Sequence, residues 1–170
     1  MSAYRIATDV EEIAKKIIAK DRKDLADARI VYLFIEKAPS SGGRITWGRA
    51  RRIGGLNAVL AHLEDHEFEK CTEPDPFFVI EISEDVWVGL DADRRRALVD
   101  HELMHCRVDA EGDVAKYSMR RHDFEEFTAV IRRHGLWTSA ADAMSGAVIE
   151  QLALALETVD ETLTPKADEE

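Results

Sequence analysis

One predicted helix, ending in the letters HELMH, constrains the fold of this chain more than any other feature. Asp91 stands at its start as a candidate N-cap, and Asp93 adds negative charge to the first turn, where the helix dipole favours it. Residues four apart in a helix lie one turn apart, so His101 and His105 share a face. Glu102 stands next to the first histidine. The fold must therefore present two imidazoles and a carboxylate on adjoining parts of one helical surface.

The spacing of these three side chains is the H-E-x-x-H pattern of zinc-dependent peptidases. Imidazoles at His101 and His105 can hold one Zn²⁺ ion, and the ion acidifies a bound water. The carboxylate of Glu102 can take the proton of that water as it attacks a carbonyl, so Glu102 is the candidate general base. The pattern also arises by chance in helical proteins, and a histidine pair without a metal remains the alternative.

A catalytic zinc usually has three protein ligands and one open position, so the sequence must supply a third ligand. We favour His122, because it precedes a predicted amphipathic helix over residues 123–133 that could aim a ligand at the first helix. Glu125, Glu126 and Glu111 remain open as alternatives. The metzincin spacing is absent, since it requires a histidine where this chain has Glu111.

The order of predicted elements indicates a single α+β domain over residues 1–160, with a small mixed sheet packed by helices. Runs of β-branched and aromatic residues predict strands, and apolar residues spaced three or four apart predict helices. The predicted strands cover residues 28–36, 44–53 and 77–83, and the predicted helices cover residues 8–20, 56–67, 91–105, 123–133 and 139–158. The polar, acidic end over residues 161–170 is predicted to be disordered.

Composition and charge narrow the classes of function. The 170 residues carry a net charge of −11, which argues against broad nucleic-acid binding, although arginine clusters leave a DNA-associated protein partner open. No apolar run reaches membrane-spanning length and no signal-peptide pattern is present, so we expect a cytoplasmic protein without a membrane partner. The 2 cysteines are too few for a disulfide scaffold, and we expect Cys106 to be a buried thiol rather than a fourth ligand.

The run ALVDHELMHC over residues 97–106, followed by HDFEEF over residues 122–127, resembles the phage metallopeptidase family. More distantly, it is similar to the SprT-type and WLM-type zincins, which pair such a helix with a later histidine. The aromatic residue after that later histidine is displaced here from its usual position, so the resemblance supports His122 less strongly than the first two ligands. The resemblance implies a zincin-like fold with zinc as cofactor, and it implies the site residues His101, Glu102, His105 and His122.

Together these inferences lead us to expect a zinc-dependent metallopeptidase that hydrolyses protein or peptide substrates. The alternative from another class is a non-catalytic binding module with a structural zinc site, in a phage or mobile-element context. A fourth protein ligand would favour the module, whereas Glu102 beside an open position favours the enzyme. A metal-free protein associated with nucleic acid is a third, weaker alternative.

The zincin resemblance also bears on substrate binding. In zincins an edge strand shortly before the metal helix commonly receives an extended substrate by strand addition. Residues 77–83 are the sequence candidate for that strand, and the other interpretation of the same residues is a central strand of the sheet.

Overall fold

The computed structural model describes residues 3–41, 43–61, 76–111, 114–123 and 144–154. Contacts within the chain divide it into two units, Met1–Arg121 and His122–Glu170. In the second unit, residues 144–154 form a helix, inside the helix predicted over residues 139–158. A single domain over residues 1–160 stays a prediction.

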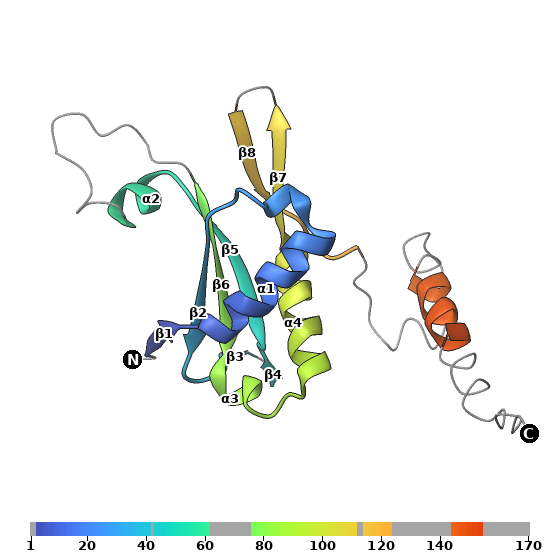
Figure 1. The fold of residues 1–170 in the computed structure, drawn as a ribbon. Helices are drawn as coiled ribbons and strands as arrows, with labels where there is room; N and C mark the ends of the chain where they lie inside the picture. The colour runs from blue at the N-terminus through green and yellow to red at the C-terminus, as the bar shows by residue number, and fades with distance from the viewer. Residues whose placement is uncertain (1–2, 42, 62–75, 112–113, 124–143, 155–170) are drawn as a thin grey trace, which may run out of the picture. The chain divides into compact units, whose positions relative to one another are not determined.

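The first unit mixes strands and helices along the chain (Figure 1). The strands are β1 (Tyr4–Ile6), β2 (Ile30–Ile35), β3 (Ser40–Ser41), β4 (Arg44–Ile45), β5 (Gly48–Ile53), β6 (Phe77–Ser83), β7 (Cys106–Glu111) and β8 (Val114–Met119). The helices are α1 (Thr8–Asp21), the 3₁₀ turn η1 (Lys23–Leu25), α2 (Leu56–Ala61), α3 (Glu84–Trp87) and α4 (Ala92–His105). The predicted elements before residue 106 are confirmed in type, except that the strand predicted over residues 44–53 is divided into β4 and β5.

Four strands form the main sheet in the order β1-β2-β6-β5. Strands β2 and β6 run parallel, whereas β1 and β5 run antiparallel to their neighbours, so the sheet is mixed. This sheet, together with the helices packed on it, confirms the α+β class. In β6, Ile80 is paired on one side with Tyr32 of β2 and on the other with Ala50 of β5. The interpretation of residues 77–83 as an edge strand is therefore wrong, and among the described strands β5 is the terminal one on that side.

One face of the sheet carries the core, and α1 and α4 lie over it (Figure 1). Alternate residues of a strand point to the same face, so Phe78, Ile80 and Ile82 point together, and each is 0% exposed. Val99 and Leu103 of α4 are equally buried in the same cluster. Burial of a leucine side chain stabilises a fold by roughly 1.5–3 kcal/mol. Because Val99 and Leu103 are buried against the sheet, the opposite side of α4 faces outward.

A two-stranded hairpin follows α4 directly and was not among the predicted elements. Its strands pair antiparallel from Cys106 opposite Met119 to Glu111 opposite Val114. The sequence did carry a signal, because Cys106 and Val108 alternate with polar residues and a Gly-Asp pair separates the two runs. The hairpin returns the chain to the C-terminal end of α4, where β7 begins.

Several predicted features lie outside the described residues. They are the end of the helix predicted over residues 56–67, the helix predicted over residues 123–133 beyond its first residue, and the tail over residues 161–170. Among the helices that the structure describes, none combines the length and apolar character needed to cross a membrane.

Candidate metal centre

Helix α4 begins and ends for clear local reasons. The Oδ1 atom of Asp91 accepts a hydrogen bond from the backbone N–H of Arg94 at 2.8 Å, so Asp91 is the predicted N-cap. The helix ends at His105 because Cys106 adopts an extended backbone, with ψ of 132°, and starts β7. The HELMH residues therefore form the last turn of α4, next to the hairpin.

The three histidines predicted as ligands lie together. One ring nitrogen from each of His101, His105 and His122 falls within 4.8 Å of the other two. The ring centroids of His101 and His105 are 5.1 Å apart, with the ring planes at 84°. His101 and His122 are exposed and His105 is partly buried, so water and a substrate can reach the cluster.

The β7–β8 hairpin explains how His122 comes to lie beside His105. Directly after β8, the backbone N–H of Arg120 donates to the carbonyl oxygen of His105 at 2.8 Å. The carbonyl oxygen of Arg120 in turn faces Nδ1 of His105 at 2.8 Å. These reciprocal bonds hold the chain, two residues before His122, against the last residue of α4. A helix beginning at His122 is not needed for this meeting, and His122 itself lies outside any helix or strand.

The bond between His105 and Arg120 also decides the tautomer of the imidazole. A carbonyl oxygen only accepts hydrogen bonds, so Nδ1 of His105 must carry the proton and donate it. In the neutral ring, Nε2 then carries the lone pair that a metal requires. Metal-bound histidines commonly donate their other ring N–H to a carbonyl or carboxylate, which fixes ring orientation and raises basicity. The arrangement around His105 therefore fits a metal ligand.

The carboxylate of Glu102 is buried, with the residue 4% exposed, although its neighbour His101 is exposed. It lies against β5, because a β-carbon added to Gly48 would be 2.5 Å from Oε1 and 2.9 Å from Cδ of Glu102. Only glycine permits this approach between strand and carboxylate. Gly48 was not among the predicted site residues, although glycine in a strand is a general sign of a close backbone approach.

The other candidate ligands have different surroundings. Glu111 ends β7 opposite Val114, and at about 3.3 Å per residue its backbone lies roughly 16 Å along the strand from Cys106. Glu125 and Glu126 lie outside the described residues. Cys106 is fully buried, and burial raises the pKa of its thiol to about 12. Its thiol donates to the carbonyl oxygen of Glu102 and is not part of the histidine cluster, so Cys106 is the buried thiol that was predicted.

The donor set suits a transition-metal ion. Three imidazoles form one of the ligand sets of catalytic zinc, and imidazole also binds copper, iron and nickel. Among the described residues, the possible metal-binding cluster consists of three side chains, those of the three histidines. A tetrahedral ion bound by these three residues would keep one position for water or substrate.

Comparison with known proteins assigns the chain to a family. No curated protein and no solved structure matches the chain. The predicted distant relation to SprT-type and WLM-type zincins stays a prediction. A family model described as "Putative phage metallopeptidase" matches residues 2–152, a span that contains the main sheet, α4, the hairpin and all three histidines. The chain therefore belongs to the phage metallopeptidase family.

Proposed function

We propose that this protein is a zinc-dependent metallopeptidase, in which His101, His105 and His122 hold the ion and Glu102 is the general base. The observation that carries the proposal is the histidine cluster, whose ligand atoms lie within 4.8 Å of one another around the last turn of α4. The family to which the chain belongs, described as phage metallopeptidases, supports the same function. The reduced, buried Cys106 suits a reducing compartment, and we propose the cytoplasm.

A bound zinc ion supplies Lewis acidity, which polarises a peptide carbonyl and lowers the pKa of water. The chain's own contribution is a proton acceptor held in place. Glu102 takes the proton from the attacking water and passes it to the nitrogen of the leaving amine. Packing against Gly48 limits the positions open to the carboxylate, so it is held ready for this transfer.

Strand β5 is the surface that we propose for substrate binding. Within the part of the chain that the structure describes, it is the terminal strand of the main sheet, and it pairs antiparallel with β6. An extended peptide can add to such an edge through main-chain hydrogen bonds, whatever its sequence. Because Gly48 of β5 touches Glu102, a peptide along this edge would pass close to the general base. Because only a polypeptide chain can pair with β5 in this way, we propose protein or peptide substrates. DNA-associated proteins remain one proposed class among them.

The non-catalytic module with a structural zinc is the second candidate. A structural zinc site is usually closed by four protein ligands. Among the described residues the cluster has three members, and the buried thiol of Cys106 donates to the carbonyl oxygen of Glu102 instead of joining the cluster. These observations favour the enzyme.

The test measures zinc content and hydrolysis in the same preparations. Wild type, His122→Ala and Glu102→Gln are purified, their zinc per chain is measured by elemental mass spectrometry, and cleavage of an unfolded protein is followed. We expect about one zinc in wild type and in Glu102→Gln, and much less in His122→Ala. Removal of the base should lower the rate at least a hundredfold, because general acid–base catalysis contributes about 10²–10⁴-fold.

Each variant tests a separate part of the proposal. Equal cleavage by wild type and Glu102→Gln would refute the mechanism, and full zinc in His122→Ala would move the third ligand to Glu125, Glu126 or Glu111. A wild type that binds no zinc after reconstitution would reduce the HELMH motif to a chance pattern.

A further inference from the structure

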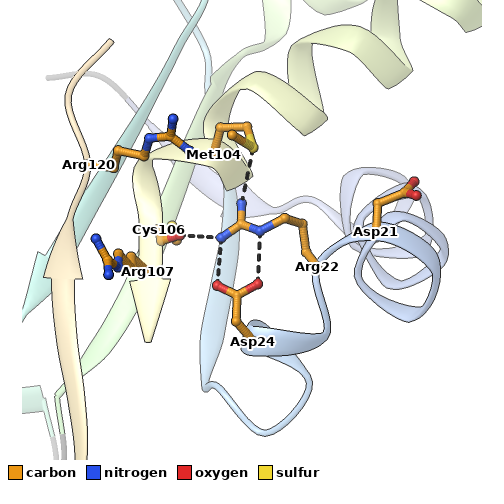
Figure 2. Close-up of a pocket in the computed structure, with 7 residues that line it drawn as sticks. All are labelled: Asp21, Arg22, Asp24, Met104, Cys106, Arg107 and Arg120. Carbon is orange, nitrogen blue, oxygen red and sulfur yellow. Dashed lines mark hydrogen bonds and ion pairs between the residues drawn. The ribbon is translucent and has the colours of Figure 1, made fainter. Parts of the chain in front are cut away.

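Arg22, which follows α1, reaches across to the end of the metal helix (Figure 2). One amino group of its guanidinium, Nη1, donates to the carbonyl oxygen of Leu103 at 2.5 Å. The other, Nη2, donates to the carbonyl oxygen of Cys106 at 2.5 Å. The side chain is 13% exposed, so these bonds form largely away from water. Arg22 thus bonds to the backbone on both sides of His105.

Asp24 holds this guanidinium from the opposite side (Figure 2). Its Oδ1 accepts from Nε of Arg22 at 2.9 Å, and its Oδ2 accepts from Nη2 at 2.9 Å. A planar guanidinium that meets a carboxylate through two bonds has a defined orientation as well as a favourable charge. The hydrogen bond from Arg22 lowers the pKa of Asp24, so the carboxylate stays ionised at neutral pH. Asp24 therefore fixes the orientation in which the guanidinium of Arg22 bonds to the end of α4.

The last turn of a helix leaves carbonyl groups without intrahelical partners, and here three of them have other donors. The carbonyl of Leu103 also receives the backbone N–H of Cys106, and the carbonyl of Glu102 receives the thiol of Cys106 at 3.7 Å. The carbonyl of His105 receives the backbone N–H of Arg120. Arg22 brings the positive charge that the negative end of the helix dipole favours.

We propose that Arg22, oriented by Asp24, is a positioning residue for the metal centre. It fixes the turn from α4 into β7, and through that turn it sets the orientation of His105. The effect reaches His122 as well, because the bonds between His105 and Arg120 depend on the same turn. This inference rests on the proposed function, since it assigns Arg22 a role in holding the ligands of that site.

The physical reason is the position of the two carbonyls. They belong to residues 103 and 106, so the guanidinium spans the point where the backbone changes from helical to extended. Helix ends fray when their carbonyls lose partners. Without the fork, the imidazole of His105 would sample orientations in which Nδ1 no longer meets the carbonyl of Arg120. The proton would then divide between the two ring nitrogens.

The experiment compares Arg22→Ala, Arg22→Lys and Asp24→Asn with wild type. Arg5→Ala is the matched control, because Arg5 also makes two bonds to one carboxylate, that of Glu84, but lies on β1 at the far edge of the sheet. Zinc affinity is measured by competition with a chromophoric chelator. In the metal-free proteins, the ¹⁵N shifts of the imidazoles report the tautomer of His105. Circular dichroism checks that each variant is folded.

We expect Arg22→Ala to weaken zinc binding about tenfold or more, since loss of groups that orient metal ligands typically costs about 10–100-fold in affinity. Arg22→Lys and Asp24→Asn should fall between Arg22→Ala and wild type, and Arg5→Ala should bind as wild type does. The Nδ1–H tautomer of His105 should dominate in wild type and Arg5→Ala and become mixed in Arg22→Ala. If Arg22→Ala does not fold, the same measurements on Arg22→Lys and Asp24→Asn test the inference.

Folded Arg22 variants with wild-type affinity and an unchanged His105 tautomer would overturn the inference and leave the proposed function standing. A wild type that binds no zinc would instead overturn the proposed function. The metal-free tautomer comparison would still decide whether Arg22 orients His105.

Discussion

At position 48 the lack of a side chain lets β5 run directly against the carboxylate of Glu102. Gly48 and Arg22 have no chemistry of their own in the proposed reaction, yet each decides where a reacting or ligating group can lie. The histidines and Glu102 could be found in the sequence because their residue types and spacing are tied to zinc chemistry. Gly48 and Arg22 act on groups far away in the chain, so no local pattern identifies the groups that they contact.

Replacement of Gly48 by alanine tests the contact with Glu102. The new β-carbon would lie 2.5 Å from Oε1, so the carboxylate would have to move. A displacement of about 1 Å can cost about a hundredfold in rate, and we expect a loss of tenfold or more in peptide cleavage with zinc content unchanged. Cleavage rate and zinc per chain, measured together, check the prediction.

Gly89→Ala is the control for this substitution, because a β-carbon there meets only the carbonyl oxygen of Val86 at an ordinary 3.5 Å. Its cleavage rate should equal that of wild type. A Gly48→Ala protein that is as active as Gly89→Ala would show that the carboxylate does not need its present position.

At the scale of the elements, α4 is held at both ends by side-chain contacts with its backbone. Asp91 bonds to the first turn, and Arg22 bonds to the last. The first contact is local and was predicted from the sequence, because an N-cap lies next to the helix that it caps. The second contact comes from another element, and it could be seen only in the folded chain.

Removal of the N-cap by Asp91→Ala should lower the free energy of unfolding by about 1 kcal/mol, which is typical for loss of a capping side chain. Asp91→Asn should retain most of the stability, because asparagine also accepts a hydrogen bond from the helix backbone. Urea denaturation of the three proteins gives the comparison. Equal destabilisation by both substitutions would mean that the charge of Asp91, rather than its bond to Arg94, stabilises the helix.

At the scale of the whole molecule, the proposed ligands come from two segments that only folding brings together. His101 and His105 belong to α4, and His122 follows β8. A ligand that binds the folded state but not the unfolded state stabilises the fold by about 2.7 kcal/mol at a hundred times its dissociation constant. Metal binding and folding should therefore be linked.

We expect zinc at that concentration to raise the midpoint of thermal unfolding of wild type by about 5–10 °C, and a chelator to reverse the shift. His122→Ala should show a much smaller shift, because one ligand is missing, whereas Glu102→Gln should shift as wild type does. Differential scanning fluorimetry is sufficient for the measurement. Identical shifts in wild type and His122→Ala would exclude His122 as a ligand.

The sequence by itself determined the α+β class, the position and cap of α4, and the identity of the histidines that lie together. Those properties depend on local periodicity and on residue chemistry, which a linear chain displays directly. The tertiary structure alone decided that β5 rather than β6 is the terminal strand, that a hairpin returns His122 to α4, and that Gly48 and Arg22 contact the site. These depend on which distant backbone segments pair and pack, and the free energy of such pairing belongs to the folded chain as a whole.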